Sequence, residues 1–273
     1  MTFKNLITIS RPRFWLYVVG PFIVGVAAAH QGFSLLIFLM AIYFTLPANL
    51  LIYGVNDIFD YETDKLNPKK GGYEDALKPS HRKDVTKMII LTNVPFLILL
   101  PLLNSTAFWS LLGFWFFGVF YSARPIRAKT KPLLDSFFNI LYIFPGLFAY
   151  GLLTGNWPSQ SIIIAATLWC MAMHAFSAVP DIKADKKAKM HTIATFFGKK
   201  ATILFCAAAY ISAAVLVIKW LGPYSVACGT IYGVLMLLAF MAKNDKQLFK
   251  IYTYFPYINA LLGFGLFMVA ILA

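Results

Sequence analysis

The run from Leu51 to Pro68 leads an apolar segment directly into three aspartates, Asp57, Asp60 and Asp64. On a helix these three positions lie within about 60° of one another, because each residue advances by about 100°. Carboxylates on one face at the end of a membrane span repel one another unless a cation lies between them. Acids that only keep a helix end in water are normally mixed with lysines, whereas here an isoleucine and two aromatic residues lie between them. The spacing therefore favours a divalent-cation site over a merely polar helix end.

A second acidic pair, Asp181 and Asp185, follows a later apolar segment. The two positions are one helical turn apart, which is a weak signal by itself because many surface helices carry such a pair. Its place repeats that of the first element, since in each case an apolar span ends in acids and a basic loop follows. Two such helix ends with the same orientation are expected to face each other across a cavity. Five carboxylates need several positive charges, and Mg²⁺ bridged to a diphosphate supplies them.

The segment from Tyr121 to Lys131 carries two arginines and two lysines. This charge is either the usual mark of a loop on the cytoplasmic side of a membrane or a phosphate-binding feature. Arginine offers paired donors and lysine a point charge, which suit a phosphate-rich leaving group, and Tyr121 and Ser122 add hydroxyl groups. Acids that hold a metal and bases that hold phosphate together describe a site that handles a diphosphate.

Other polar positions fit either a functional or a structural role. His174, two turns before the second acidic pair, is either a proton acceptor or a hydrogen-bonded packing residue. Asn139 and Tyr142 either line the cavity or join neighbouring helices. The basic loop from Lys65 to Lys83 either closes over the site or only connects two helices. His191 and Thr192, which follow the second acidic pair, are candidate supporting groups.

The elements that must position these residues are membrane helices. Hydrophobic residues make up 60% of the 273 residues and charged residues 13%, which excludes an ordinary soluble domain. Most apolar runs have the length that crosses a bilayer as a helix, without the alternation of a barrel strand. We expect a single transmembrane domain over residues 1–273. The nine predicted spans are 14–29, 34–55, 86–103, 107–121, 134–153, 161–180, 201–218, 222–241 and 253–272.

The distribution of charge predicts the orientation in the membrane. Of the 24 Lys and Arg residues, all but Lys219 lie in the N-terminus and in the loops after the even-numbered spans, counting Lys87 at the start of the third span, and all 11 acids lie on the same side. The positive-inside rule places this side in the cytoplasm and the C-terminus on the opposite side of the cell membrane. The net charge of +13 is thereby explained, and nucleic acid is not an expected partner. We expect an all-α bundle of nine transmembrane helices around a central cavity that opens at the cytoplasmic face.

Three stretches resemble the UbiA superfamily of intramembrane prenyltransferases: N-D-I-F-D-Y-E-T-D at 56–64, Y-S-A-R-P-I-R-A-K at 121–129 and D-I-K-A-D at 181–185. The resemblance covers nearly the whole chain, since the family implies nine helices with acidic motifs after the second and the sixth. It implies Mg²⁺ as the cofactor and a prenyl diphosphate as the donor. Lys183 departs from the family pattern, in which an acid is commoner, and would repel a metal but attract phosphate. The implied roles are metal binding for Asp57, Asp60, Asp64, Asp181 and Asp185, diphosphate binding for Asn56, Tyr121, Ser122, Arg127 and Lys129, and catalysis for Asp60, Asp181 and Lys129.

Further runs are most similar to the carotenoid-modifying lycopene elongases, which add C5 units to a C40 chain: S-R-P-R-F-W at 10–15, P-L-L-D-S-F-F-N-I-L-Y at 132–142 and M-H-A-F-S-A-V-P-D from 173. This resemblance implies that dimethylallyl diphosphate (DMAPP) is ionised and that its prenyl group is transferred to a carbon of lycopene or a related carotenoid among the membrane lipids. An aromatic acceptor of quinone-type lipid biosynthesis is the alternative within the enzyme class. A cation-coupled transporter is the alternative outside it, but the face opposite the acids lacks an acid to complete an ion path.

Overall fold

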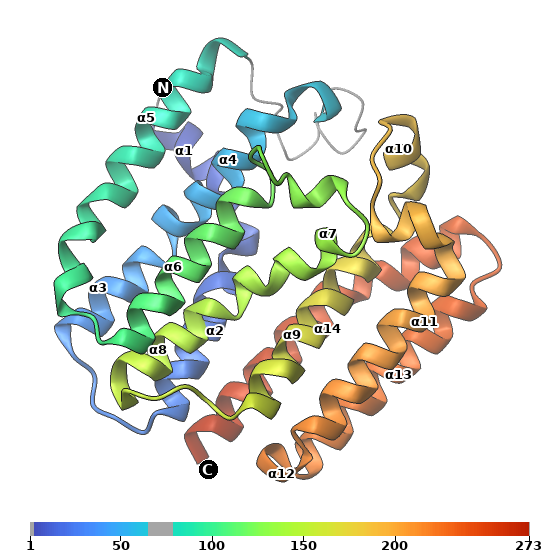
Figure 1. Ribbon diagram of the computed structural model, residues 1–273. Helices are drawn as coiled ribbons and strands as arrows, with labels where there is room; N and C mark the ends of the chain where they lie inside the picture. Colours follow the sequence, from blue (N-terminus) through green and yellow to red (C-terminus); the bar gives the residue numbers. More distant parts are fainter. Residues whose placement is uncertain (1–2, 65–78, 273) are drawn as a thin grey trace. The chain divides into compact units, whose positions relative to one another are not determined.

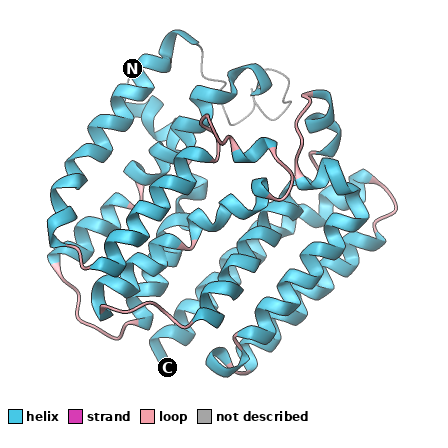
Figure 2. Cartoon of the chain, in the orientation of Figure 1, coloured by secondary structure: helices cyan, strands magenta, loops and turns pink. Residues whose placement is uncertain are grey.

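The computed structural model describes the backbone of residues 3–64 and 79–272 and the side chains of residues 4–60 and 80–272. Within these residues the regular structure is entirely helical, with no strand, which confirms the predicted all-α class (Figures 1 and 2). The chain forms two compact units: unit 1 is Met1–Arg127 with Phe144–Trp157, and unit 2 is Ala128–Ile143 with Pro158–Ala273. The single domain over 1–273 stays a prediction.

The described residues of unit 1 form seven α-helices and three 3-10 segments. Two of the helices begin at a residue whose side chain caps the first turn. Ser34 accepts a hydrogen bond from the amide of Ile37 at 3.2 Å, and Asn104 accepts one from the amide of Ala107 at 2.9 Å. Such side-chain caps satisfy amides that the first turn of a helix leaves unpaired. The elements are α1 (Phe3–Ser10), η1 (Pro12–Phe14), α2 (Trp15–Ala28), α3 (Leu35–Tyr43), α4 (Leu46–Asp64), η2 (Pro79–His81), α5 (Arg82–Asn93), η3 (Val94–Leu102), α6 (Ser105–Phe120) and α8 (Phe144–Thr154).

Four buried phenylalanines from different elements form the centre of unit 1. Phe22, Phe44, Phe114 and Phe148 are each at most 1% exposed, and their ring centroids lie 5.2 to 6.4 Å apart where they contact one another. Rings at these separations pack favourably beyond the area they bury. Helix α8 lies against α2 and α6, and α4 lies against α1 and α5 (Figure 1). The acidic end of α4 is therefore held beside the end of α1.

Unit 2 is centred on α11, which lies against α9 and α13 (Figure 1). Tyr210 of α11 and Tyr232 of α13 stack with ring centroids 4.1 Å apart. Trp169 of α9 donates to the Tyr232 hydroxyl, which donates to Asn259 of α14. These hydrogen bonds join three helices within an apolar setting, and the ring stack adds α11. The elements are η4 (Ala128–Thr130), α7 (Leu134–Phe137), η5 (Phe138–Tyr142), α9 (Gln160–Ala178), α10 (Ile182–Lys187), α11 (Ile193–Leu216), α12 (Ile218–Leu221), α13 (Pro223–Met241) and α14 (Asp245–Leu272).

Each predicted span falls on helical structure in the described part of the chain. Six helical stretches there are long and apolar enough to cross a membrane, and the bent pair Leu134–Tyr142 with Phe144–Thr154 would be a seventh. Helices α2 and α6 are shorter, with 14 and 16 residues. An integral membrane protein with several spans is thus supported, and the count of nine crossings stays a prediction.

Two predicted spans differ in detail from the helices that form them. The span over 34–55 is built from α3 and α4, and Pro47 lies in the first turn of α4, where its missing amide costs no hydrogen bond. The span over 201–218 falls mostly on α11, which begins earlier, is interrupted at Gly198 (φ 79°, ψ 169°) and ends at Leu216. Almost only glycine adopts this conformation, so the interruption is specified by that residue.

Candidate active site

The acidic end of α4 is helical as far as Asp64, so Asp57 and Asp60 lie three residues apart on one face, as predicted. Both residues are 3% exposed. A carboxylate buried to this extent is stable only where cations or hydrogen-bond donors face it. The side chain of Asp64 and most of the predicted loop from Lys65 to Lys83 lie outside the described residues.

Arg11 faces the first of these carboxylates. Its Nη2 lies 2.7 Å from Oδ1 of Asp57, and its guanidinium carbon lies 4.8 Å from the centre of the Tyr53 ring. The cation is therefore held by a carboxylate and by an aromatic face. Arg11 has a left-handed backbone (φ 52°) in the turn between α1 and η1. It is not among the predicted site residues, and the S-R-P-R-F-W run is the sequence signal that points to it.

The segment after α6 supplies partners for the same face of α4. Nη2 of Arg127 lies 3.7 Å from Oδ1 of Asp60, and Nδ2 of Asn56 donates to Oγ of Ser122 at 3.1 Å. Ser122 is buried and follows Tyr121, the C-terminal cap of α6. We call the resulting group the α4 cluster. It comprises Arg11, Asn56, Asp57, Asp60, Ser122 and Arg127, all in unit 1.

The second acidic pair lies in unit 2 at the turn after α9. That helix ends at Ala178, and Pro180, which has no amide to continue it, is followed by Asp181 as the N-cap of the separate helix α10. The amide of Asp185 donates to the carbonyl of Asp181 at 2.8 Å, so the pair is one turn apart as predicted. Lys129, also in unit 2, lies in η4 and is 6% exposed.

The departure at Lys183 has a local partner. Its Nζ lies 2.6 Å from Oδ2 of Asp245, and both side chains are exposed to solvent. The hydrogen bond and charge of Asp245 raise the pKa of the Lys183 ammonium above its usual value. The positive charge within the second acidic motif is therefore directed toward the start of α14, which reduces its expected repulsion of a metal.

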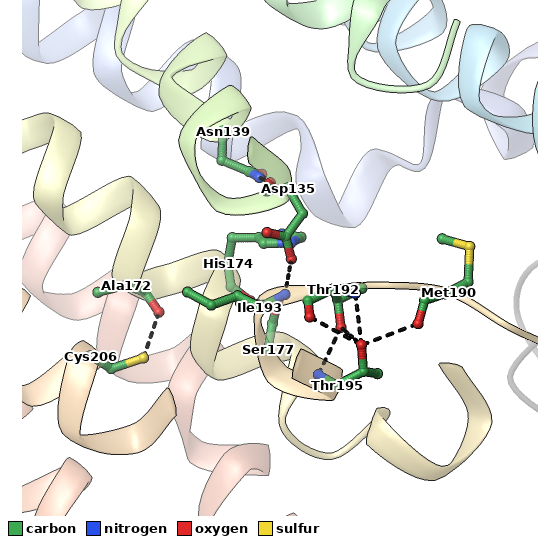
Figure 3. Close-up of polar contacts among 10 residues, drawn as sticks. All are labelled: Asp135, Asn139, Ala172, His174, Ser177, Met190, Thr192, Ile193, Thr195 and Cys206. Atoms are coloured by element: carbon green, nitrogen blue, oxygen red, sulfur yellow. Dashed lines mark hydrogen bonds and ion pairs between the residues drawn. The ribbon is translucent and has the colours of Figure 1, made fainter. Parts of the chain in front are cut away.

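Three other polar candidates of unit 2, Asn139, His174 and Thr192, lie near Asp135 (Figure 3). Nε2 of His174 lies 3.5 Å from Oδ2 of Asp135. The side chain of Asn139 donates to the Asp135 carbonyl at 2.7 Å, a contact within its own segment, which favours its structural role. Thr192 accepts the amide of Thr195 and caps α11. His191 is exposed.

The donor set of the α4 cluster fits a magnesium ion that arrives with a diphosphate. No group of three or more His, Cys, Asp or Glu side chains lies together as a metal site among the described residues. Asp57 and Asp60 offer the hard oxygen ligands that Mg²⁺ prefers. A diphosphate would bring further oxygens to the metal, and Arg11 and Arg127 are suited to binding them.

Comparison with known proteins identifies the family. Residues 18–255 match the UbiA prenyltransferase family. A lycopene elongase/hydratase from Haloarcula japonica is 38% identical over 97% of this chain and 90% of its own length, and one from Haloferax volcanii is 39% identical over 94% and 85%. The solved structure of a UbiA homolog from Archaeoglobus fulgidus bound to DMAPP and Mg²⁺ is 20% identical, covers 97% of this chain and 98% of that one, and has a TM-score of 0.70. The chain therefore belongs to the UbiA prenyltransferase family and is a prenyltransferase.

Proposed function

We propose that this enzyme uses Mg²⁺ to ionise DMAPP and transfers the C5 group to a carbon of lycopene or a related carotenoid. The observation that carries the proposal is the pair of buried carboxylates, Asp57 and Asp60, each facing an arginine at the end of an apolar helix. The carotenoid acceptor is supported by two relatives named lycopene elongase/hydratase. The donor and the metal are supported by the DMAPP and Mg²⁺ bound to the homolog of the same fold.

The proposed roles divide the polar residues between metal and diphosphate. When bound, Mg²⁺ would supply positive charge that offsets the charge developing on the departing diphosphate. Arg127 and Lys129 donate to the phosphate oxygens as this charge develops. Metal binding is assigned to Asp57, Asp60, Asp64, Asp181 and Asp185, diphosphate binding to Asn56, Tyr121, Ser122, Arg127 and Lys129, and catalytic roles to Asp60, Asp181 and Lys129.

The reaction follows from ionisation of an allylic ester. The C–O bond breaks, and the diphosphate leaves with the electron pair. A terminal C=C bond of the acceptor donates its π electrons to the allylic cation, which forms a C–C bond and leaves a tertiary cation. That cation either loses a proton to a base or takes up water and then releases a proton. Apolar surroundings limit premature capture by water, and aromatic faces stabilise the cations.

The proposal includes nine crossings of the cell membrane around a cavity that opens to the cytoplasm. A carotenoid reaches such a cavity from the bilayer, whereas the charged donor reaches it from water. The N-terminus and the loops that carry the acids would lie on the cytoplasmic side, as the positions of Lys and Arg predict.

The test is to incubate membranes that contain the protein with DMAPP and Mg²⁺, adding either lycopene or a hydroxybenzoate. The molecular masses of the extracted lipids are then measured. We expect the carotenoid to gain one or two C5 units, with or without water. Membranes with the Asp60→Ala variant serve as the control. Alkylation of the hydroxybenzoate alone would replace the carotenoid acceptor with an aromatic one, and no product from either acceptor would refute the proposal.

A further inference from the structure

Asp135 is a buried carboxylate at which three helices of unit 2 meet (Figure 3). It lies in α7 and is 0% exposed. Its Oδ2 accepts the backbone amide of Ile193, the first residue of α11, at 2.8 Å. Nε2 of His174, on α9, lies 3.5 Å from the same oxygen. One carboxylate therefore contacts both α9 and the start of α11.

Each of these neighbours places a nitrogen against the Oδ2 oxygen of this carboxylate. The amide of Ile193 belongs to the first turn of a long helix, where the backbone dipoles produce a partial positive charge. His174 adds a full charge when it is protonated. Burying a carboxylate is costly, and an apolar residue would fill the same space without that cost. The carboxylate is therefore better explained by the geometry that it fixes than by packing.

Hydrogen bonds extend from Asp135 to the turn that contains Lys129. The amide of Asp135 donates to the carbonyl of Lys131 at 2.9 Å, and the amide of Lys131 donates to the carbonyl of Ala128 at 2.9 Å. Lys129 lies inside this turn, so a displacement of Asp135 moves the backbone that carries the lysine.

A second series of hydrogen bonds extends from the start of α11 to the second acidic pair. The amide of Thr192 donates to Oγ1 of Thr195 at 2.8 Å, and that hydroxyl lies 3.1 Å from the Met190 carbonyl, to which it donates. The amide of Met190 donates to the carbonyl of Asp185 at 2.8 Å. Figure 3 shows the part of this series from Thr192 to Met190 beside Asp135.

We propose that Asp135 is a positioning residue for prenyl transfer. By holding the start of α11 and facing His174, it fixes the position of the turn that carries Lys129 relative to Asp181 and Asp185. The lysine and the two acids can then bind the same diphosphate. This inference rests on the proposed function and adds a residue that does not itself touch the substrate. Its effect on diphosphate binding is exerted through Lys129.

The test compares Asp135→Ala and Asp135→Asn with the wild-type protein in detergent. Binding of inorganic pyrophosphate with Mg²⁺ is measured by calorimetry, and kcat and KM for DMAPP are measured with lycopene. We expect Asp135→Ala to weaken pyrophosphate binding and raise the KM for DMAPP between about tenfold and 100-fold, because displaced binding groups lose affinity steeply. Asp135→Asn should recover most of this loss, since its amide oxygen still accepts the Ile193 amide. Asp84→Asn, which alters an exposed aspartate in the first turn of α5, is the matched control and should behave as the wild type.

A double variant separates positioning from folding. If Asp135 acts through Lys129, Asp135→Ala combined with Lys129→Ala should bind pyrophosphate no more weakly than Lys129→Ala alone. Additive losses, or wild-type binding by Asp135→Ala, would overturn the inference. So would a loss of folded protein whose remaining fraction binds normally. If Asp135→Ala cannot be purified, Asp135→Leu, which fills the same space but offers no acceptor oxygen, takes its place with the same criteria. A wild-type protein that neither binds pyrophosphate nor transfers a prenyl group would instead refute the proposed function.

Discussion

At the scale of single residues, the α4 cluster explains how acids are kept at the end of an apolar helix. The charge of Asp57 is balanced by Arg11 and that of Asp60 by Arg127. One arginine precedes the two acids in the sequence, and the other follows them. A guanidinium has five N–H donors, and one carboxylate uses at most two of them. A guanidinium can therefore pair with an aspartate and with a phosphate oxygen at the same time. The same side chains thus serve both folding and the proposed chemistry.

The pair of Arg11 and Asp57 should be important for stability. Removing Arg11 leaves a carboxylate buried without its cation, so Arg11→Ala should lower the free energy of unfolding by about 3 kcal/mol. Thermal unfolding of the purified protein in detergent measures this loss. Arg13→Ala, at an exposed neighbouring position, is the control and should change stability by less than about 0.5 kcal/mol. Adding Asp57→Asn to Arg11→Ala should restore much of the loss, and no recovery would mean that charge is not its cause.

The metal assignment predicts that two acids from different units are each indispensable. Asp60→Ala or Asp181→Ala should abolish prenyl transfer and leave insertion into the membrane intact, since each change removes a proposed ligand from an otherwise folded helix end. Product formation and membrane fractionation measure the two properties. Treatment of the wild type with EDTA should stop turnover and added Mg²⁺ should restore it. Full activity in either variant would contradict the assignment.

At the scale of elements, glycine and proline determine where the helices that carry the site begin and end. Pro180 ends the continuation of α9 and leaves Asp181 to cap a separate short helix. Gly198 interrupts α11 in a conformation that side chains other than hydrogen rarely allow. The segment of α11 that is tied to Asp135 is thereby separated from the long segment that packs in the core of unit 2.

The interruption at Gly198 gives a prediction for two glycines. Gly198→Ala should destabilise the protein by about 1–3 kcal/mol, because its backbone (φ 79°) is strained for any side chain. Gly233→Ala is the matched control: it is a helical glycine of α13 with no atom near the added carbon, so it should be neutral or stabilising by up to about 1 kcal/mol. Thermal unfolding of both variants in detergent tests the difference. Equal stabilities would show that α11 straightens without cost.

At the scale of the whole molecule, the charge distribution separates the two faces of the membrane protein. Only Lys219 among the Lys and Arg residues lies away from the predicted cytoplasmic side. All 11 acids lie on that predicted side too, so the charged donor and the metal are expected to approach from the cytoplasm.

Reporter fusions test this orientation. Alkaline phosphatase, which folds only outside the cytoplasm, should be active when fused after the C-terminal Ala273. It should be inactive when fused after Lys243, in a predicted cytoplasmic loop, and green fluorescent protein should give the opposite pattern. The same activity for both phosphatase fusions would show an even number of membrane crossings between Lys243 and Ala273 and would contradict the predicted topology.

The sequence alone determined the features that depend on neighbouring residues. Apolar runs of bilayer length predict helices, and the spacing of Asp57 and Asp60 places both on one face because helical geometry is local. The family followed from motifs that are continuous in the chain. Local spacing could not, however, indicate that Arg11 is the partner of Asp57 or place an end of α4 beside the turn after α6.

Only the tertiary structure decided the contacts between residues far apart in the chain. Arg11 and Asp57 are separated by 46 positions, Asn56 and Ser122 by 66, and Asp135 and Ile193 by 58. Many pairings of buried acids with donors satisfy the same charges, and no local preference selects one of them. The packing of α1 against α4 and of α7 against α9 makes the selection, because a buried carboxylate can use only the donors that packing brings within reach.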